Sequence, residues 1–302
     1  MKNEERLKEG KKAALIGIIG NIFLTFFNIA VGIISGSYAL ISEGLHTFSD
    51  IITSVISYIG FRIGQRPADK EHPFGHGRSE AIAGLIIVLF LAMVSYEILT
   101  GAIDKILNYE DIITPNYLAA IMAFIGIIIN TLTSRYIISL GKKINSPAIV
   151  ADGNHQKVDI YSSIAILASV IISQLGFPIF DPIVGFIIGI LILKTAFEVG
   201  IENVNNIMGK VSSKELINEI KSSALSVNHV LGVHNIKVDY FGTYAIVSLH
   251  IDLDSKLTLV ESHEIVHNVQ NNVSEEIAIV KSVTVHACPY GEIYNHKQEI
   301  DI

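Results

Sequence analysis

Long apolar stretches alternate with short polar stretches over the first two-thirds of the chain. The apolar stretches lie at about 13–35, 38–64, 80–106, 116–140, 147–174 and 178–202. A helix needs about 20 apolar residues to cross a bilayer, and each stretch is long enough. The pattern predicts a helical membrane protein whose six-helix transmembrane domain covers residues 13–208, after a polar cytosolic tail at 1–12. The second and fifth stretches are the weakest, because His and Asp interrupt both.

The last third of the chain has a different pattern. The segments SSKELINEIKSSALSV and LVESHEIVHNVQNNV show the apolar spacing of helices, whereas VLGVHNIKVDYF, YAIVSLHIDLD and VKSVTVHACPY alternate as strands do. The order αββαβ predicts a small layered α+β domain over residues 209–294, of the metallochaperone-like kind, followed by a tail at 295–302.

Composition agrees with a membrane protein. Hydrophobic residues make up 50% of the 302 residues and charged residues only 17%, below the roughly 25% of soluble domains. The net charge of −7 and the lack of a basic patch with interleaved aromatics argue against nucleic acid as a partner. The one cysteine, Cys288, excludes an internal disulfide and fits a reducing compartment. No small-residue cleavage motif follows the first apolar run, so we expect no signal peptide.

The distribution of cations predicts the orientation of the helices. Most Lys and Arg residues outside the last domain fall on one side: Lys2, Arg6, Lys8, Lys11, Lys12, Arg62, Arg66, Lys70, Arg78, Arg135, Lys142 and Lys143. The other side has Lys105 among several acids. Since cytoplasmic loops carry the excess of cations, we expect a multi-pass protein of the inner or plasma membrane with both termini in the cytoplasm. A large soluble helical bundle is the alternative interpretation.

Ionisable residues lie inside two of the apolar stretches. His46 and Asp50 are four residues apart in the second, and His155 and Asp159 repeat this spacing in the fifth. Side chains four apart share one face of a helix. If the two faces meet, two imidazoles and two carboxylates form an N₂O₂ set suited to tetrahedral Zn²⁺. Such residues at membrane depth usually mark an ion path, although each pair could instead be an interhelical hydrogen bond.

Two further groups of residues could bind metal. The connection between the second and third stretches, QRPADKEHPFGHGRSE, brings Asp69, His72 and His76 within eight residues. Prolines at 67 and 73 disfavour a helix there, so a compact loop could fold around an ion. The last domain is rich in histidine, and it has His286 and Cys288 on the same side of one expected strand. We expect a metal site there as well, and set aside His229, His267 and His296. Glu43 could face the intramembrane set or the membrane interface.

These features closely resemble the cation diffusion facilitator family, in particular its bacterial zinc and iron type of efflux transporter. The resemblance rests on H-x-x-x-D in the second and fifth spans, PADKEHPFGHGR between the second and third, and the αββαβ tail. It implies a homodimer that exports divalent metal cations from the cytoplasm against protons. It also implies a transport site, a loop site and a binuclear tail site: His46, Asp50, His155 and Asp159; Asp69, His72 and His76; His234, His250, His263 and His286.

The chain departs from the family pattern at two positions. Many relatives have Asp two residues after the last tail histidine, where this chain has Cys288, a softer donor that could still bind zinc. Bacterial relatives also pair the basic residue after GHG with an acid after the sixth span. Here the basic residue is Arg78, but Gly209 stands in the place of the acid, so a charged interlock between subunits must use another residue or be weaker.

The ligand types favour Zn²⁺ as the transported ion, exchanged for protons, and as a structural or regulatory ligand of the other sites. Neutral imidazole and ionised carboxylate are needed to bind metal, and histidine titrates near working pH. Fe²⁺ and Mn²⁺, or Co²⁺ and Cd²⁺, are alternative cargoes of the same transporter type. Two alternative hypotheses from other functional classes are a membrane metal sensor and a membrane metalloenzyme. No nucleophile motif supports an enzyme.

Overall fold

The computed structural model describes residues 3–108, 110, 112–143, 147–209, 213–241 and 244–290. The chain forms two compact units, one of Met1–Ile56 with Ile86–Val199, and one of Ser57–Leu85 with Gly200–Ile302. The tail predicted at 295–302, including His296, lies outside the described residues. The connection that carries Asp69, His72 and His76 therefore belongs to the same unit as the C-terminal domain.

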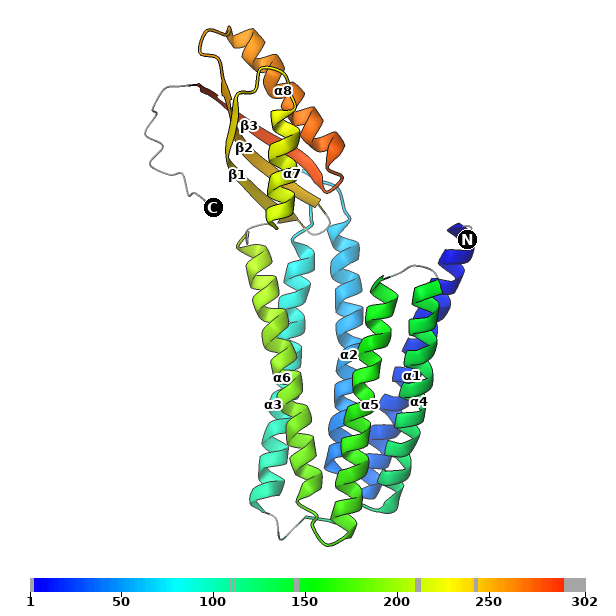
Figure 1. Cartoon of the computed structure of the whole chain (residues 1–302). Coiled ribbons are helices and arrows are strands. Elements are labelled where there is room, and N and C mark those ends of the chain that lie inside the picture. The colour runs from blue at the N-terminus through cyan, green and yellow to red at the C-terminus, as the bar shows by residue number, and fades with distance from the viewer. Residues whose placement is uncertain are drawn as a thin grey trace. The chain divides into compact units, whose positions relative to one another are not determined.

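Six long helices form where the apolar stretches predict them (Figure 1). They are α1 (Asn3–Ser35), α2 (Tyr38–Gly64), α3 (Ser79–Leu107), α4 (Tyr117–Lys143), α5 (Pro147–Gln174) and α6 (Phe180–Ile207). Among the described residues, five of these helices are long and apolar enough to cross a membrane. The exception is α2, because polar residues such as His46 and Asp50 lower its hydropathy. The prediction of a six-helix membrane region thus agrees with the structure, with α2 as the one helix of the six that falls short of the apolar length.

Apolar side chains lie both inside and outside the helical bundle. Leu40, Ile98, Ile166 and Ile192 are each at most 1% exposed and belong to one buried cluster. Many large apolar side chains point outward: Phe26, Leu89, Met93, Tyr96 and Phe197 are each at least 65% exposed. A helix that is apolar on every side is expected in lipid rather than in water. The outer surface of the bundle therefore matches a bilayer.

Asp181 fastens the beginning of α2 to the beginning of α6. Its side chain is 1% exposed and accepts hydrogen bonds from the Ser37 hydroxyl at 2.7 Å and from the backbone N–H groups of Tyr38 and Ala39. The first N–H groups of a helix have no partner inside the helix, and a carboxylate there also interacts favourably with the helix dipole. Asp181 therefore sets where α2 begins relative to α6, and α2 carries His46 and Asp50.

The C-terminal domain has the αββαβ order that the alternating pattern predicts. It consists of α7 (Lys214–Leu225), β1 (Gly232–Phe241), β2 (Tyr244–Leu253), α8 (Leu259–Glu276) and β3 (Val280–Pro289). The strand order is β1-β2-β3, with β1 antiparallel and β3 parallel to β2. Both helices pack on one face of the sheet (Figure 1), over alternate residues of β2 such as Val247 and Leu249. The other residues of β2, including His250 and Asp252, face away from the helices.

A capping box begins α8. The Thr258 hydroxyl accepts from the Glu261 backbone N–H at 3.3 Å, and the Glu261 carboxylate accepts from the Thr258 backbone N–H at 2.8 Å. We expect Thr258→Ala to lower the free energy of opening of the first turn of α8 by about 1 kcal/mol, because an N–H group loses its acceptor. Amide hydrogen exchange of α8 in the full-length protein measures this. Unchanged exchange would contradict the capping role.

The same box predicts an acid-sensitive start of α8. Hydrogen bonds from the backbone N–H and hydroxyl of Thr258 lower the pKa of Glu261 below its ordinary value. A carboxyl group whose pKa is lower in the folded state stabilises the fold above its unfolded pKa of about 4.3, and this contribution disappears as the pH falls through the folded pKa. We expect the protection factors of the amides in the first turn to fall on acidification below about pH 4. In Glu261→Gln this fall should be absent.

Candidate metal sites

Residues from α2 and α5 form the intramembrane group. His155 Nε2 lies 3.9 Å from Asp50 Oδ2, which joins the two helices. Asp159 interacts electrostatically with His46 and His155 and also with Asp50. The structure therefore places the four residues of the repeated H-x-x-x-D pattern in one region, although among the described residues they do not form a group whose donor atoms all lie within 4.8 Å of one another. Two imidazoles and two carboxylates in one region can hold a divalent ion of the Zn²⁺ type.

Glu43 lies beside this group. Its side chain is 3% exposed, and among the described residues Oε2 has no hydrogen-bond partner. It interacts electrostatically with Asp50 and Asp159. The sequence left Glu43 open between the cavity and the membrane interface, and the structure places it in the buried interior.

The connection between α2 and α3 gathers Asp69, His72 and His76. Asp69 lies 3.5 Å from a ring nitrogen of each histidine, and one donor atom from each of the three residues lies within 4.8 Å of the others. The Asp69 carboxylate accepts from the backbone N–H groups of His72 at 2.7 Å and Glu71 at 2.9 Å. The His72 N–H is the main cause that lowers the pKa of Asp69. The group therefore offers an ionised carboxylate and two imidazoles to a cation.

The same connection is bound to the sheet of the C-terminal domain. Arg78 Nη2 lies 2.8 Å from Asp239 Oδ2 on β1, and the Arg78 guanidinium lies 4.6 Å from the ring centre of Phe241. The Tyr244 hydroxyl donates to the backbone carbonyl of Phe74. The interlock between subunits stays a prediction, and within the chain Arg78 pairs with Asp239. This partner could not be predicted, because β1 lies 161 residues further along the chain.

Gly77 allows this close contact. A Cβ atom at Gly77 would lie 2.2 Å from the backbone oxygen of Phe241. We expect Gly77→Ala to displace the connection from β1 at a cost of about 1–3 kcal/mol, because the backbone cannot move aside as a flexible side chain could. Faster tryptic cleavage at the exposed Lys70 measures the displacement.

The control for this prediction is Gly20→Ala, whose Cβ would meet only Thr133 Cγ2, at 3.5 Å. It should leave cleavage at the connection unchanged. Equal cleavage of Gly77→Ala and the intact protein would contradict the contact between the connection and β1.

A row of histidines crosses the sheet. His234, His250 and His286 are direct partners on β1, β2 and β3. Their ring centres are 5.2 Å apart between His234 and His250 and 4.8 Å apart between His250 and His286. In the next row, Asp252 pairs with Cys288. These residues lie on the face of the sheet that the helices leave uncovered.

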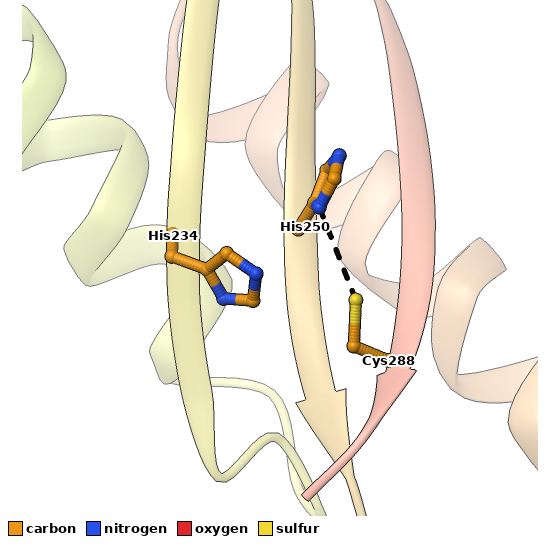
Figure 2. A group of neighbouring side chains, drawn as sticks. All are labelled: His234, His250 and Cys288. Atoms are coloured by element: carbon orange, nitrogen blue, oxygen red, sulfur yellow. Dashed lines mark hydrogen bonds between the residues drawn. The ribbon is translucent and has the colours of Figure 1, made fainter. Parts of the chain in front are cut away.

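Three donors of this face converge (Figure 2). Ligand atoms of His234, His250 and Cys288 lie within 4.8 Å of one another, and Cys288 Sγ is 3.9 Å from His250 Nδ1. Two residues that the sequence analysis missed hold the histidines. Asp252 Oδ2 is 3.4 Å from His234 Nδ1, and Asn235 Nδ2 is 3.2 Å from His250 Nε2. Asp252 could have been found from the sequence, because it lies two residues after His250 in an alternating strand and so faces the same side of the sheet.

His263 does not join this cluster within the described part of the chain. It lies on α8, and its Nε2 is 3.1 Å from Nε2 of His267, which the sequence analysis had set aside. The reason is topological, because α8 covers the opposite face of the sheet through Ile265 and Val269. The family pattern identifies His263 as a candidate ligand but does not say on which face of the sheet it lies.

Comparisons with known proteins match both parts of the chain. The model of the cation efflux transmembrane domain matches residues 14–208, and that of the cation efflux protein cytoplasmic domain matches residues 212–290. An uncharacterized transporter of Methanocaldococcus jannaschii is 35% identical over 93% of this chain and 98% of its own length. The manganese efflux system protein MneP of Bacillus subtilis is 30% identical over 95% of this chain and 99% of its own.

The magnetosome protein MamB of Magnetospira sp. is 28% identical over 89% of this chain and 92% of its own. Among solved structures, a MamM CTD variant in its nickel form is 29% identical over 25% of this chain and 96% of its own, with a TM-score of 0.25.

Proposed function

The chain belongs to the cation diffusion facilitator family of divalent-metal efflux transporters, and from this premise we propose that it exports Zn²⁺ in exchange for protons. The family consists of transporters rather than enzymes. We propose three things: which ion is transported, that it is exchanged for protons, and which residues bind it.

The observation that carries the proposal is the meeting of the two H-x-x-x-D pairs. The contact of His155 with Asp50 and the interaction of Asp159 with His46 join α2 to α5. Four ligands of the N₂O₂ type suit a tetrahedral ion without a preferred d-electron geometry, which is Zn²⁺. The two carboxylates offset the charge of the ion, which would otherwise be costly to hold at membrane depth.

The exchange for protons follows from the ligands. A metal ion binds neutral imidazole, whereas a proton makes His46 or His155 cationic and excludes the metal. Loading from the cytoplasm therefore releases protons, and protons on the far side would displace the ion. An inward proton gradient would then drive the metal outward.

The remaining parts have proposed roles in a homodimer with both termini in the cytoplasm. The C-terminal domain, which matches the cytoplasmic domain of cation efflux proteins, would hold two copies together and sense cytosolic metal. The group of Asp69, His72 and His76 would bind a second ion. Its connection reaches β1 through Arg78 and Asp239, which gives a route between the loop site and the sheet.

Mn²⁺ is the second candidate cargo. It is favoured by the names of two relatives, the manganese efflux system proteins MneP and MneS of Bacillus subtilis, at 30% and 31% identity. Against it stands the ligand set, since Mn²⁺ prefers oxygen donors and binds such sites more weakly than Zn²⁺.

Calorimetric titration in detergent tests the proposal. Zn²⁺ is added to the intact protein and to Asp50→Ala/Asp159→Ala in two buffers that differ in ionisation enthalpy. The intact protein should bind one more ion than the variant, with release of protons on binding. Equal binding and equal proton release would overturn the assignment, and tighter extra binding of Mn²⁺ than of Zn²⁺ would favour the second candidate.

A further inference from the structure

We propose that a basic pocket between α4 and α5 binds the phosphate headgroup of an anionic phospholipid. The two helices lie side by side (Figure 1), with a cavity of about 610 Å³ between them. Three cations line this basic pocket: Arg135 and Lys142 of α4 and Lys157 of α5. The proposed transport site uses none of them, and binding of a lipid here does not depend on which ion is carried.

The basic pocket has an excess of positive charge. Among the residues that the structure describes, no acid lines the cavity and none of the three cations forms an ion pair with one. A cation at membrane depth is costly unless it is paired or hydrated. A lipid phosphate supplies the opposite charge, and Arg135 can bind it through two parallel N–H donors.

The polar groups of the pocket form one stripe on each helix. Residues three or four apart share one face of a helix. On α4 this spacing joins the lining residues Thr131, Arg135, Ser139 and Lys142. On α5 it joins Lys157 and Tyr161. Hydroxyl groups therefore accompany the cations, and both kinds of side chain can donate hydrogen bonds to phosphate oxygens.

The depth of the pocket suits a headgroup. Arg135 is eight residues from the end of α4 at Lys143, or about 12 Å along the helix, and Lys157 is ten residues from the start of α5 at Pro147, or about 15 Å. Long cationic side chains at such positions reach the level of the headgroups. In the orientation proposed above, this end of α4 and α5 faces the cytoplasm, so the lipid belongs to the cytoplasmic leaflet.

Farther along both helices, the faces that carry the cations become apolar and stay exposed. On α4 the stripe continues through Ile128 and Phe124, and on α5 through Ile164 and Ile171, each between 43% and 54% exposed. These residues follow Arg135 and Lys157 at intervals of three, four or seven, which keeps them on the same faces. Charge followed by an apolar stripe matches a phospholipid with its acyl chains, whereas a soluble phosphate would use the polar part alone.

The three cations favour a headgroup with a net negative charge. Phosphatidylcholine carries a quaternary ammonium group that offsets its phosphate, whereas phosphatidylglycerol keeps its negative charge. Basic pockets between transmembrane helices on the cytoplasmic side bind anionic headgroups, and each Lys or Arg near such lipids strengthens binding by about fivefold. Phosphatidylglycerol should therefore bind the pocket more tightly than phosphatidylcholine.

Native mass spectrometry of the full-length protein, with lipids added in detergent and EDTA present, tests the site. We expect the intact protein to bind phosphatidylglycerol at least about fivefold more tightly than phosphatidylcholine. In Arg135→Gln/Lys157→Gln, which lacks two of the cations, the affinity for phosphatidylglycerol should fall by about 25-fold. The affinity for phosphatidylcholine should change less.

Two control variants separate this effect from others. Lys194→Gln removes a cation that is also on a long helix, but is 68% exposed and pairs with Glu198. It should bind phosphatidylglycerol as the intact protein does. Asp50→Ala/Asp159→Ala should do the same, because the transport residues do not line the pocket. Loss of transport with retained lipid binding in that variant distinguishes this inference from the proposed function.

Glycerol 1-phosphate distinguishes a lipid site from a site for soluble phosphates, because it offers the phosphate without acyl chains. In large excess it should leave phosphatidylglycerol bound. Three results would overturn the inference: equal affinity of the intact protein for the two lipids, binding by the double variant equal to that of Lys194→Gln, and displacement of the lipid by glycerol 1-phosphate. The first and third need no variant, so they hold even if the double variant fails to fold.

Discussion

Asp50→Ala and Asp159→Ala should each reduce metal flux by about 100-fold or more, since even residues that only orient a metal ligand contribute about 10- to 100-fold. Each variant removes one of the two carboxylates that face the imidazoles across α2 and α5. The remaining ligands would carry too little negative charge to hold a divalent ion at membrane depth. Initial rates of Zn²⁺ uptake into proteoliposomes measure the effect.

The matched control for this prediction is Glu198→Ala. Glu198 is also an acid on a long helix, but its side chain is 64% exposed and pairs with Lys194 of the same helix, at 3.6 Å. It should transport as the intact protein does, because a surface ion pair contributes little. If Asp50→Ala or Asp159→Ala transports metal as fast as Glu198→Ala, the two His–Asp pairs are structural polar contacts and not a transport site.

Asp181→Ala should lower the free energy of unfolding by about 3 kcal/mol or more, because a buried charged acceptor is removed and its donors are left without it. The donors are the Ser37 hydroxyl and the N–H groups of Tyr38 and Ala39. Thermal unfolding in detergent measures the loss. Transport should fall as well, because α2 would no longer be fixed to α6 at its beginning.

Asp104→Ala controls for the loss of an acid. Asp104 accepts a hydrogen bond from the Asn108 side chain at 3.0 Å, but it is exposed. Its removal should therefore change stability by no more than about 0.5 kcal/mol, as is usual for surface substitutions. If Asp181→Ala melts at the same temperature as Asp104→Ala, the contact does not anchor α2.

Most of the fold can be predicted from the periodicity of hydrophobic residues. Apolar stretches predict the long helices and alternation predicts the αββαβ domain, because both signals come from residues close together in the sequence. The helix ends are less predictable. The first span was expected to begin at residue 13, whereas α1 begins at Asn3, since Glu and Lys are good helix formers and continue the helix beyond its apolar part.

The two His–Asp pairs in the membrane region could be predicted from the sequence, because residues four apart share one face of a helix. Contacts between strands and between segments far apart in the sequence could not be predicted. Asp239 as the partner of Arg78, and Asp252 and Asn235 as holders of two histidines, depend on strand register. Within one chain, His263 lies on α8, which covers the opposite face of the sheet from the histidine row, so its grouping with the sheet histidines stays a prediction.

Gradient-driven flux is the most direct test of the central claim. Proteoliposomes that contain the intact protein, with an imposed pH gradient, are offered Zn²⁺, Mn²⁺, Fe²⁺, Co²⁺ and Cd²⁺ in turn. Metal should move against the proton flow, with Zn²⁺ fastest, and the flux should collapse when the gradient is removed. Flux that is independent of the pH gradient, or no flux of any of the metals, would contradict the account.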